Sequence, residues 1–335
     1  MGQTLRIAIG IIVSVFFLLW AKSLVGNLGD ALTAARDANK LFVLPGLIVY
    51  FAGVWLRAIR WHFLLRPVKS VPTNRLFPVV VIGYMANDVL PARLGEVVRA
   101  FVLGEQEGIP KTTSLATILV ERMFDGIAML IFVAAVGLVV PFSDQLTTIV
   151  RVAAAIFLVA LIVLVVAGSS RETATGAITA FERVLPASLR GRVVPVADRF
   201  LEGLSSLRSA PLAAAILGLS LAAWLCEATM YYIISLGFSM NLAIPAYVLT
   251  TAVANLGAMV PAAPGYVGTF EAFALVALSL FSPDKGTAGA FVVVVHVALL
   301  VPITLLGFYY LWRANLSLRT LGQRATAATS DGAPT

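Results

Sequence analysis

The sequence is poor in charged residues and in cysteine. Only 12% of its 335 residues are charged and 60% are hydrophobic, whereas soluble domains have about 25% charged and about 45–50% apolar residues. This composition excludes a soluble globular protein, a disordered chain, a collagen and a small disulfide scaffold. The single cysteine, Cys226, excludes an intrachain disulfide and a cysteine-based metal cluster. We therefore expect an all-α integral membrane protein, and no motif indicates a metal or another cofactor.

The net charge of +7 arises from 24 lysine and arginine residues against 17 acidic residues. In a soluble protein this excess would suggest a nucleic-acid partner. In a membrane protein it follows the loops that stay in the cytoplasm. We therefore expect membrane lipids and no nucleic acid as partners, and the sequence is also compatible with a homo-oligomer.

Six long apolar segments predict transmembrane helices. Each is long enough to cross a hydrocarbon layer of about 30 Å. The first follows Arg6 and resembles the apolar part of a signal peptide, but no small-residue cleavage site follows it closely, so we interpret it as a retained span. The six segments cover approximately residues 7–25, 41–65, 112–140, 146–167, 211–236 and 287–312.

Two further apolar segments, residues 76–103 and 245–281, do not fit a single span. The first is interrupted around Pro91 and the second between Pro261 and Gly265. Proline has no N–H to donate, and polar backbone groups at membrane depth must be buried in protein or line a wet cavity. Both interruptions contain Asn, Pro, Gly and Glu in that order. This favours an inverted repeat with a site between its halves, although proline and glycine are also common at unrelated helix breaks.

The distribution of basic residues predicts the orientation. The linker after residue 65, the segment 168–210 and the C-terminal tail carry arginines, whereas the connections 141–144 and 237–241 carry no base. The positive-inside rule places the first three, and with them both termini, in the cytoplasm. Each interrupted segment must then enter and leave on one side, the first from the cytoplasm and the second from outside. The prediction is six full spans plus two broken or re-entrant elements, six to eight spans in all, in the cytoplasmic membrane of a prokaryote.

The chain is expected to form one polytopic domain over residues 1–315. It includes the connector 168–210, in which charged and apolar residues interleave. We interpret the connector either as one or two amphipathic helices on the inner leaflet or as a loop that merely obeys the positive-inside rule. Residues 316–335 are rich in Ala, Thr and Ser and predict a disordered tail.

Charged residues in apolar surroundings mark the candidate site, because each costs at least about 2.5–3.5 kcal/mol to insert. Arg93, Glu96 and Arg99 recur every three residues, so Glu96 can pair with either arginine on a helix. The second cluster is Glu121, Arg122 and Asp125. Pooled, the clusters hold three acids and three bases. That balance fits a closed salt-bridge network between helices, and it also fits an anion-binding cavity.

The helix breaks favour the cavity interpretation. The helices that follow them should begin near Leu94–Gly95 and near Tyr266–Val267, where unpaired N–H groups and a positive dipole end face any ligand. Arginine forks beside such groups suit a phosphate-bearing headgroup. Glu227 lies alone in an apolar segment and needs an arginine or an N–H as partner, whereas His296 is interpreted as a satisfied interior histidine.

Three stretches resemble the lysylphosphatidylglycerol synthase transmembrane-region family, also called the flippase-like domain family. They are Asn87–Arg99, Val120–Asp125 and Pro261–Glu271, and the resemblance covers about residues 5–315. It implies movement of lipids or lipid-linked sugars between leaflets. The positions of this sequence that match the family's functional residues are Asn87, Pro91, Arg93, Gly95, Glu96, Arg99, Glu121, Arg122, Asp125, Pro264, Gly265 and Glu271.

Bifunctional members of the family carry an aminoacyl-transferase domain after the membrane part. This chain continues only about twenty residues past its last span, so synthase activity is not expected.

The leading hypothesis is a flippase or scramblase-like transporter for a phospholipid or a polyprenyl-phosphate headgroup. The alternatives are an integral-membrane glycosyltransferase that uses a polyprenyl-phosphate sugar, and a non-transporting accessory protein. The sequence contains no P-loop, no metal-ligand spacing and no GxSxG motif, and no residue is predicted to be catalytic. The predicted binding residues are Asn87, Pro91, Arg93, Gly95, Glu96, Arg99, Glu121, Arg122, Asp125, Glu227, Asn255, Pro261, Pro264, Gly265, Gly268 and Glu271.

Overall fold

The computed structural model describes residues 3–25, 27–90, 94–142, 193–205, 209–258 and 263–316, together with short pieces between residues 148 and 176. Side chains are not described for residues 3–10 and 193. The described part of the chain folds into helices joined by short connectors and contains no β-strand. The prediction of an all-α protein is therefore confirmed.

Among the described residues, three helices are long and apolar enough to cross a membrane. They are α3 (Val43–Leu65), α10 (Ala210–Gly237) and α13 (Lys285–Arg313). A short 3-10 turn, η1 (Lys40–Phe42), directly precedes α3 and belongs to the same span. A fourth candidate is a pair of helices bent by 78°, α1 (Gln3–Val25) and α2 (Leu28–Asp37). The described residues thus give three or four apolar spans, and six full spans are not established. The expected span 146–167 lies largely outside the described residues.

Helix α6 (Lys111–Gly137) has 27 residues and begins within one residue of its predicted start. It differs from the three apolar spans because its central turns carry the charged cluster Glu121, Arg122 and Asp125. Charges at such positions must be paired inside the protein if the helix is to lie in a bilayer.

Two pairs of short helices occupy the interrupted segments. The first hairpin is formed by α4 (Thr73–Val89) and α5 (Gly95–Glu107), and the second by α11 (Ile244–Gly257) and α12 (Thr269–Ser279), with the 3-10 turn η4 (Pro264–Tyr266) between its helices. Their lengths of 11 to 17 residues correspond to about 17–26 Å, shorter than a hydrocarbon layer of about 30 Å. Within each hairpin, the two helices pack against each other.

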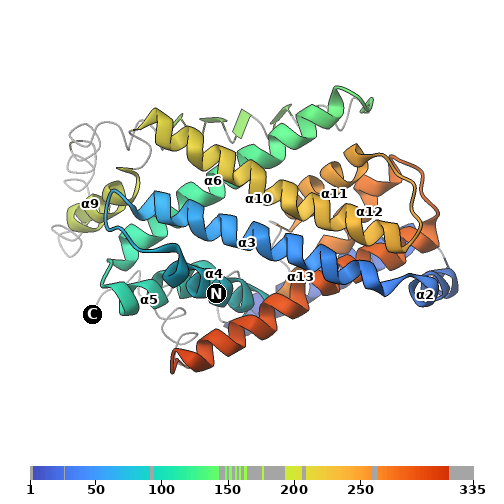
Figure 1. Cartoon of the computed structure of the whole chain (residues 1–335), viewed down its shortest axis with the longest axis horizontal. Coiled ribbons are helices and arrows are strands. Elements are labelled where there is room, and N and C mark those ends of the chain that lie inside the picture. Colours follow the sequence, from blue (N-terminus) through green and yellow to red (C-terminus); the bar gives the residue numbers. More distant parts are fainter. Residues whose placement is uncertain are drawn as a thin grey trace.

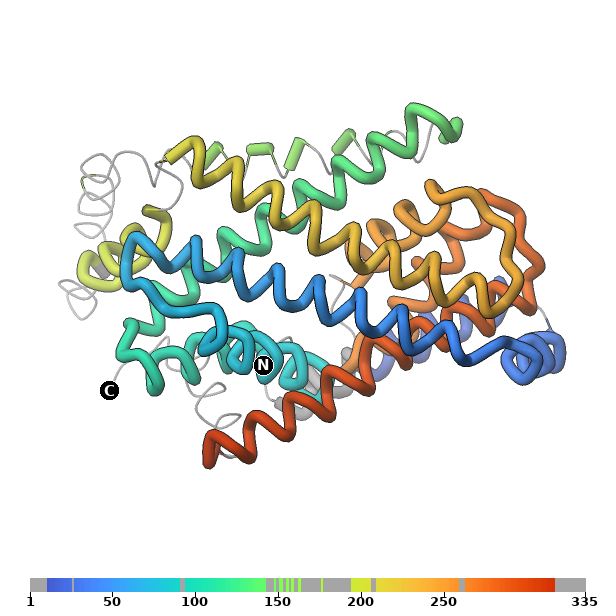
Figure 2. The backbone as a smooth tube through the Cα atoms, in the orientation of Figure 1, coloured from blue at the N-terminus to red at the C-terminus, as the bar shows by residue number. Residues whose placement is uncertain are grey.

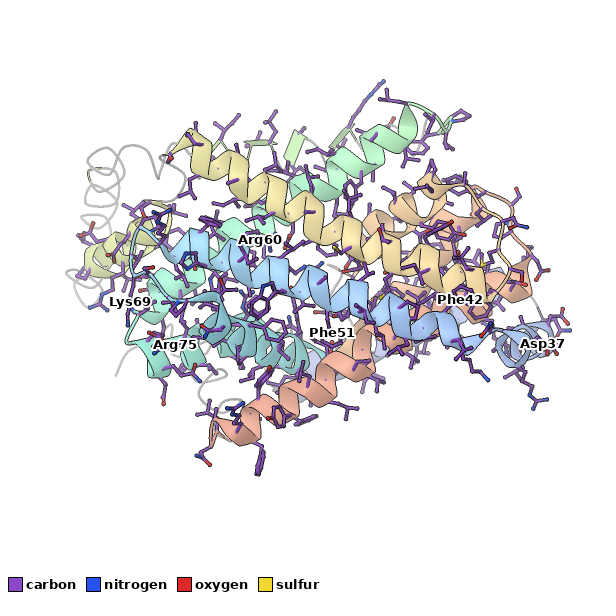
Figure 3. All side chains as sticks on the ribbon, in the orientation of Figure 1. Asp37, Phe42, Phe51, Arg60, Lys69 and Arg75 are labelled. Atoms are coloured by element: carbon purple, nitrogen blue, oxygen red, sulfur yellow. The ribbon has the colours of Figure 1, made fainter. Side chains whose placement is uncertain are left out.

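The two hairpins lie at opposite ends of the bundle (Figure 1). The α4–α5 hairpin is at the end where α3 finishes and where α9 (Val193–Gly203) lies, and the α11–α12 hairpin is near α2. Figure 2 shows α3, α10 and α13 running between these ends. The labelled Lys69 and Arg75 lie at the first end and Asp37 at the other (Figure 3).

Glycine permits the close approach within the first hairpin. A Cβ atom on Gly95 would collide with the carbonyl oxygen of Gly83 and with the side chain of Asn87. The Asn87 side chain instead accepts a hydrogen bond from the Gly95 N–H at 2.8 Å. The start of α5 therefore lies in direct contact with the last turns of α4.

The connector contains one helix that packs on the bundle. Leu201 and Leu204 of α9 and its following turn are buried, and Gly203 lies against Ala116 of α6. This is consistent with the predicted amphipathic helix over the second part of the connector. Residues 177–192 of the connector and 317–335 of the tail lie outside the described residues, so the expected first helix and the tail stay predictions.

Replacing Gly95 with alanine is expected to destabilise the protein. The added methyl group overpacks the α4–α5 contact, a change that costs about 1–3 kcal/mol in packed interiors. The matched control is Gly218→Ala on α10, where a Cβ meets open space and alanine gains up to about 1 kcal/mol of helix propensity. Thermal unfolding of both variants in detergent measures the difference. A Gly95→Ala protein as stable as Gly218→Ala would contradict the close packing.

Candidate functional site

A network of buried ion pairs joins helices α3, α5 and α6. The Arg99 guanidinium of α5 donates two hydrogen bonds to the Glu121 carboxylate of α6, at 2.8 and 3.1 Å. Arg60 of α3 is completely buried, lies 3.3 Å from Glu121 and forms a hydrogen-bonded ion pair with Asp125. Because hydrogen-bonded pairing offsets the cost of burying each charge, these contacts let charged residues sit in the middle of the bundle.

Arg122 completes this network from α6 itself. It contacts Glu121 at 2.6 Å and Asp125 at 3.1 Å, and 31% of its side chain remains exposed. The Trp224 indole N–H of α10 donates a further hydrogen bond to Asp125 at 2.8 Å. Two carboxylates on successive turns of α6 therefore hold three guanidinium groups, of which Arg122 is the most accessible.

A second ion pair joins α3 to α10 and to the second hairpin. Arg57 contacts the Glu227 carboxylate at 2.9 Å, and the Asn255 amide of α11 donates to the other oxygen of Glu227, also at 2.9 Å. The Arg57 guanidinium also lies 4.3 Å from the centre of the Trp224 ring. Glu227 thus has the arginine partner that its isolated position in the sequence requires.

Sequence reasoning did not include Arg57 and Arg60 among the predicted binding residues. Both are buried, with 4% and 0% of their surface exposed. Their spacing of three residues on one helix face inside an apolar run was the available signal. Their carboxylate partners come from α6 and α10, which are remote in sequence, so the pairing could not be read from the spacing.

Of the two arginines that the spacing offered to Glu96, Arg99 has a different partner, and Arg93 lies outside the described residues. Arg99 is directed toward α6 and binds Glu121, whereas Glu96 lies one turn earlier and lines a cavity. The reason is the length of an arginine side chain, which reaches a carboxylate on the neighbouring helix and satisfies two donors there. Pro91, Arg93 and Pro261 lie outside the described residues, so their predicted roles stay predictions.

A cavity of about 420 Å³ lies between the two hairpins and the ion pairs. Both hairpins supply polar lining, namely Asn87, Asp88, Glu96 and Asn255. The surrounding helices α3, α6, α10 and α13 supply Arg57, Arg122, Asp125, Glu227 and His296. The structure therefore brings many of the predicted residues to one cavity. Arg99 and Glu121 do not line it, but Glu121 forms an ion pair with the lining residue Arg122.

The starts of the second helices of the hairpins are partly satisfied by their own side chains. The Gly95 N–H donates to Asn87, and the Gly268 N–H donates to the Glu271 carboxylate at 2.7 Å. Helix α12 begins at Thr269, later than the predicted 266–267. One donor at each helix start is consequently unavailable to a ligand, contrary to the expectation of wholly unpaired N–H groups.

The second break is shaped by Pro264, Gly265 and Gly268. Pro264 opens the turn η4, and Gly265 and Gly268 adopt positive φ angles of 70° and 94°. The His296 ring contacts the Gly265 carbonyl oxygen at 2.8 Å and the Glu271 carboxylate at 2.6 Å. His296 thus has a partner at each nitrogen, as expected for an interior histidine, but it also lines the cavity.

Within the described ranges, no group of three or more His, Cys, Asp and Glu side chains is arranged to hold a metal ion.

The fold and the cavity define a helical membrane protein whose candidate site, with its polar and charged side chains, lies between two hairpins. The chain belongs to the family of the lysylphosphatidylglycerol synthase TM region, which matches residues 7–307.

Several curated relatives cover most of the chain. It is 25% identical over 308 residues to the "Glycosyltransferase AglD" of Haloferax volcanii, covering 83% of this chain but 49% of the relative. It is 24% identical over 292 residues to a "UPF0104 membrane protein" of Methanothermobacter thermautotrophicus, covering 82% of this chain and 86% of the relative. The chain thus spans about half the length of the glycosyltransferase. No solved structure matches the chain significantly.

Glu121→Gln is expected to destabilise the protein strongly. It removes the charge shared by Arg60, Arg99 and Arg122, and loss of one partner of a buried ion pair costs about 3–5 kcal/mol. The matched control is Glu202→Gln on the exposed face of α9, where surface charges contribute about 0–1 kcal/mol. Thermal unfolding in detergent compares them. Equal melting of the two variants would show that the network does not stabilise the bundle.

Proposed function

We propose that the protein is a flippase- or scramblase-like transporter that moves a lipid headgroup through the cavity between its hairpins. The observation that carries the proposal is a cavity of about 420 Å³ to which both hairpins contribute polar side chains. Ligand pockets commonly measure about 300–1,000 Å³, so this volume is suitable for a phospholipid or sugar-phosphate headgroup. Membership in the lysylphosphatidylglycerol synthase TM region family supports a membrane role.

The proposal includes six full spans in the cytoplasmic membrane. Four are the apolar helices α3, α10 and α13 and the bent pair α1–α2, and the other two are α6 and residues 146–167. Pairing of its charged residues makes α6 compatible with a bilayer. The α4–α5 hairpin would enter from the cytoplasm, where the exposed Lys69 and Arg75 suit the positive-inside rule. The α11–α12 hairpin would enter from outside, as in inverted-repeat transporters whose site lies at the repeat interface.

The charges of the lining favour a phosphate-bearing headgroup that also carries hydrogen-bond donors. Arg57 and Arg122 offer guanidinium groups suited to phosphate oxygens. Asp88 and Glu96 are acceptors on the first hairpin and suit hydroxyl or ammonium groups. A zwitterionic phospholipid or a polyprenyl-phosphate sugar has both kinds of group.

The glycosyltransferase alternative rests on one relative, the Haloferax protein named a glycosyltransferase. The chain matches only 49% of that protein, so its named activity can belong to the part that has no counterpart here. Incubating the purified protein with a polyprenyl-phosphate sugar and an acceptor, followed by mass spectrometry of the lipids, separates the proposals. A new covalent product would favour the enzyme, and unchanged lipids favour the transporter.

Leaflet exchange in reconstituted vesicles tests the transporter directly. We expect fluorescent phospholipid or polyprenyl-phosphate lipid to exchange faster in vesicles with the protein than in empty vesicles. Glu96→Gln should slow this exchange by roughly tenfold or more, because a hydrogen bond to a charged group contributes about 1.5–3 kcal/mol. Glu202→Gln, remote from the cavity, serves as the matched control and should exchange lipids like the wild type.

Two results would oppose the transporter. Exchange no faster than in empty vesicles, for every lipid tested, would contradict it. Normal exchange by a folded Glu96→Gln protein would contradict the assignment of the cavity. An accessory role predicts that Glu96→Gln changes only stability, so loss of exchange with unchanged melting would exclude that alternative.

A further inference from the structure

His296 lies between two hydrogen-bond acceptors. Its Nδ1 is 2.6 Å from Oε1 of Glu271, and its Nε2 is 2.8 Å from the backbone carbonyl oxygen of Gly265. The other oxygen of Glu271 already accepts the Gly268 N–H. The histidine is buried, with 7% of its surface exposed, and Phe270 stacks on its ring at 4.4 Å between centroids. Both ring nitrogens are therefore committed to these two contacts.

The number of protons in this pair follows from its geometry. A neutral imidazole has one N–H, whereas a carbonyl and an ionised carboxylate can only accept. With a neutral histidine and an ionised Glu271, one nitrogen would face an acceptor with its lone pair. Both contacts become hydrogen bonds only when the pair binds one more proton, either as an imidazolium beside a carboxylate or as a neutral imidazole beside a protonated Glu271.

The pair is located where the two hairpins meet. A Cβ atom on Gly265 would lie 3.6 Å from the backbone oxygen of Asp88, at the end of α4. Thr304 of α13 donates to the Asp88 carboxylate at 2.8 Å. Helix α13 consequently holds the first hairpin through Thr304 and the second through His296. Loss of the additional proton would turn one of the contacts of His296 into a repulsion and would release either Gly265 or Glu271.

The charged groups near His296 come from several helices. Glu271 of α12 is its direct partner, and Asp88 of α4 interacts with it electrostatically. Across the cavity lie further ionisable groups of α3, α4, α5, α6 and α10, namely Tyr50, Arg57, Tyr84, Glu96, Arg122, Asp125 and Glu227. Arg57, Arg122, Asp125 and Glu227 are held in ion pairs with each other or with Glu121. Glu271 is the carboxylate within hydrogen-bond distance of His296.

We propose that His296 and Glu271 form a proton-binding site that holds the tips of the two hairpins together and whose deprotonation permits them to separate. The proposal deepens the transporter function and rests on it for its effect on lipid exchange. Proton release from this pair would then be linked to opening of the headgroup cavity between the hairpins. The proton itself would be the coupling ion or the regulator of the transport cycle.

Nitrogen NMR of histidine tests the proton site without any lipid movement. The chain has two histidines, so a His62→Gln background leaves His296 as the single imidazole. Its ring nitrogen signals should change with pH as the pair gains and loses the additional proton. Glu271→Gln should remove this change, because the amide donates to Nδ1 and still accepts the Gly268 N–H. Signals that do not change with pH, or that titrate identically in Glu271→Gln, would overturn the proposal.

Leaflet exchange against pH tests the consequence. Exchange by the wild type should rise by roughly tenfold as the pH is raised across the range in which the NMR signals change, whereas Glu271→Gln should exchange slowly at every pH. The control Glu202→Gln should follow the wild type. Equal pH profiles of wild type and Glu271→Gln would overturn the link to opening. If no lipid moves at any pH, the transporter function fails, and the NMR titration still decides whether the proton site exists.

Discussion

Pairing of buried charges is the constraint on which the structure depends. A guanidinium or carboxylate in an apolar bundle is costly unless it is hydrogen-bonded to an opposite charge. Glu121 and Asp125 on α6 meet this requirement for arginines from α3 and α5. Because the partners belong to different helices, the pairs fix how α3, α5 and α6 face one another, and Glu227 does the same for α3 and α10.

The hairpins follow from the same constraint applied to the backbone. Where a helix ends inside the bundle, its polar groups need partners or water. Asn87 and Glu271 supply partners to the first N–H groups after each break. Asn87 also lines the cavity, together with Gly265 and Tyr266 at the second break. A cavity with polar and charged side chains in its wall thus forms where the two interrupted segments meet.

Sequence patterns predicted the local features and not the long-range pairs. Apolar runs and prolines located α3, α10, α13 and both hairpins closely, because hydrophobicity and helix breaking act within a few residues. The isolated Glu227 indicated that a partner was required. Its partner Arg57 is 170 positions away, and the pairing of Arg99 with Glu121 depends on the packing of α5 against α6. Such contacts exist only after folding, so the spacing along α5 did not reveal the partner of Arg99.

The central claim is that two hairpins enter from opposite faces and meet at one cavity. Labelling of single cysteines by a membrane-impermeant reagent tests it, in a Cys226→Ser background and in vesicles of known orientation. Ser70→Cys and Gln106→Cys flank the first hairpin at exposed positions, and Asn241→Cys and Ser279→Cys flank the second. The first two should be labelled from one face and the last two from the opposite face. Labelling of the two ends of either hairpin from different faces would contradict the claim.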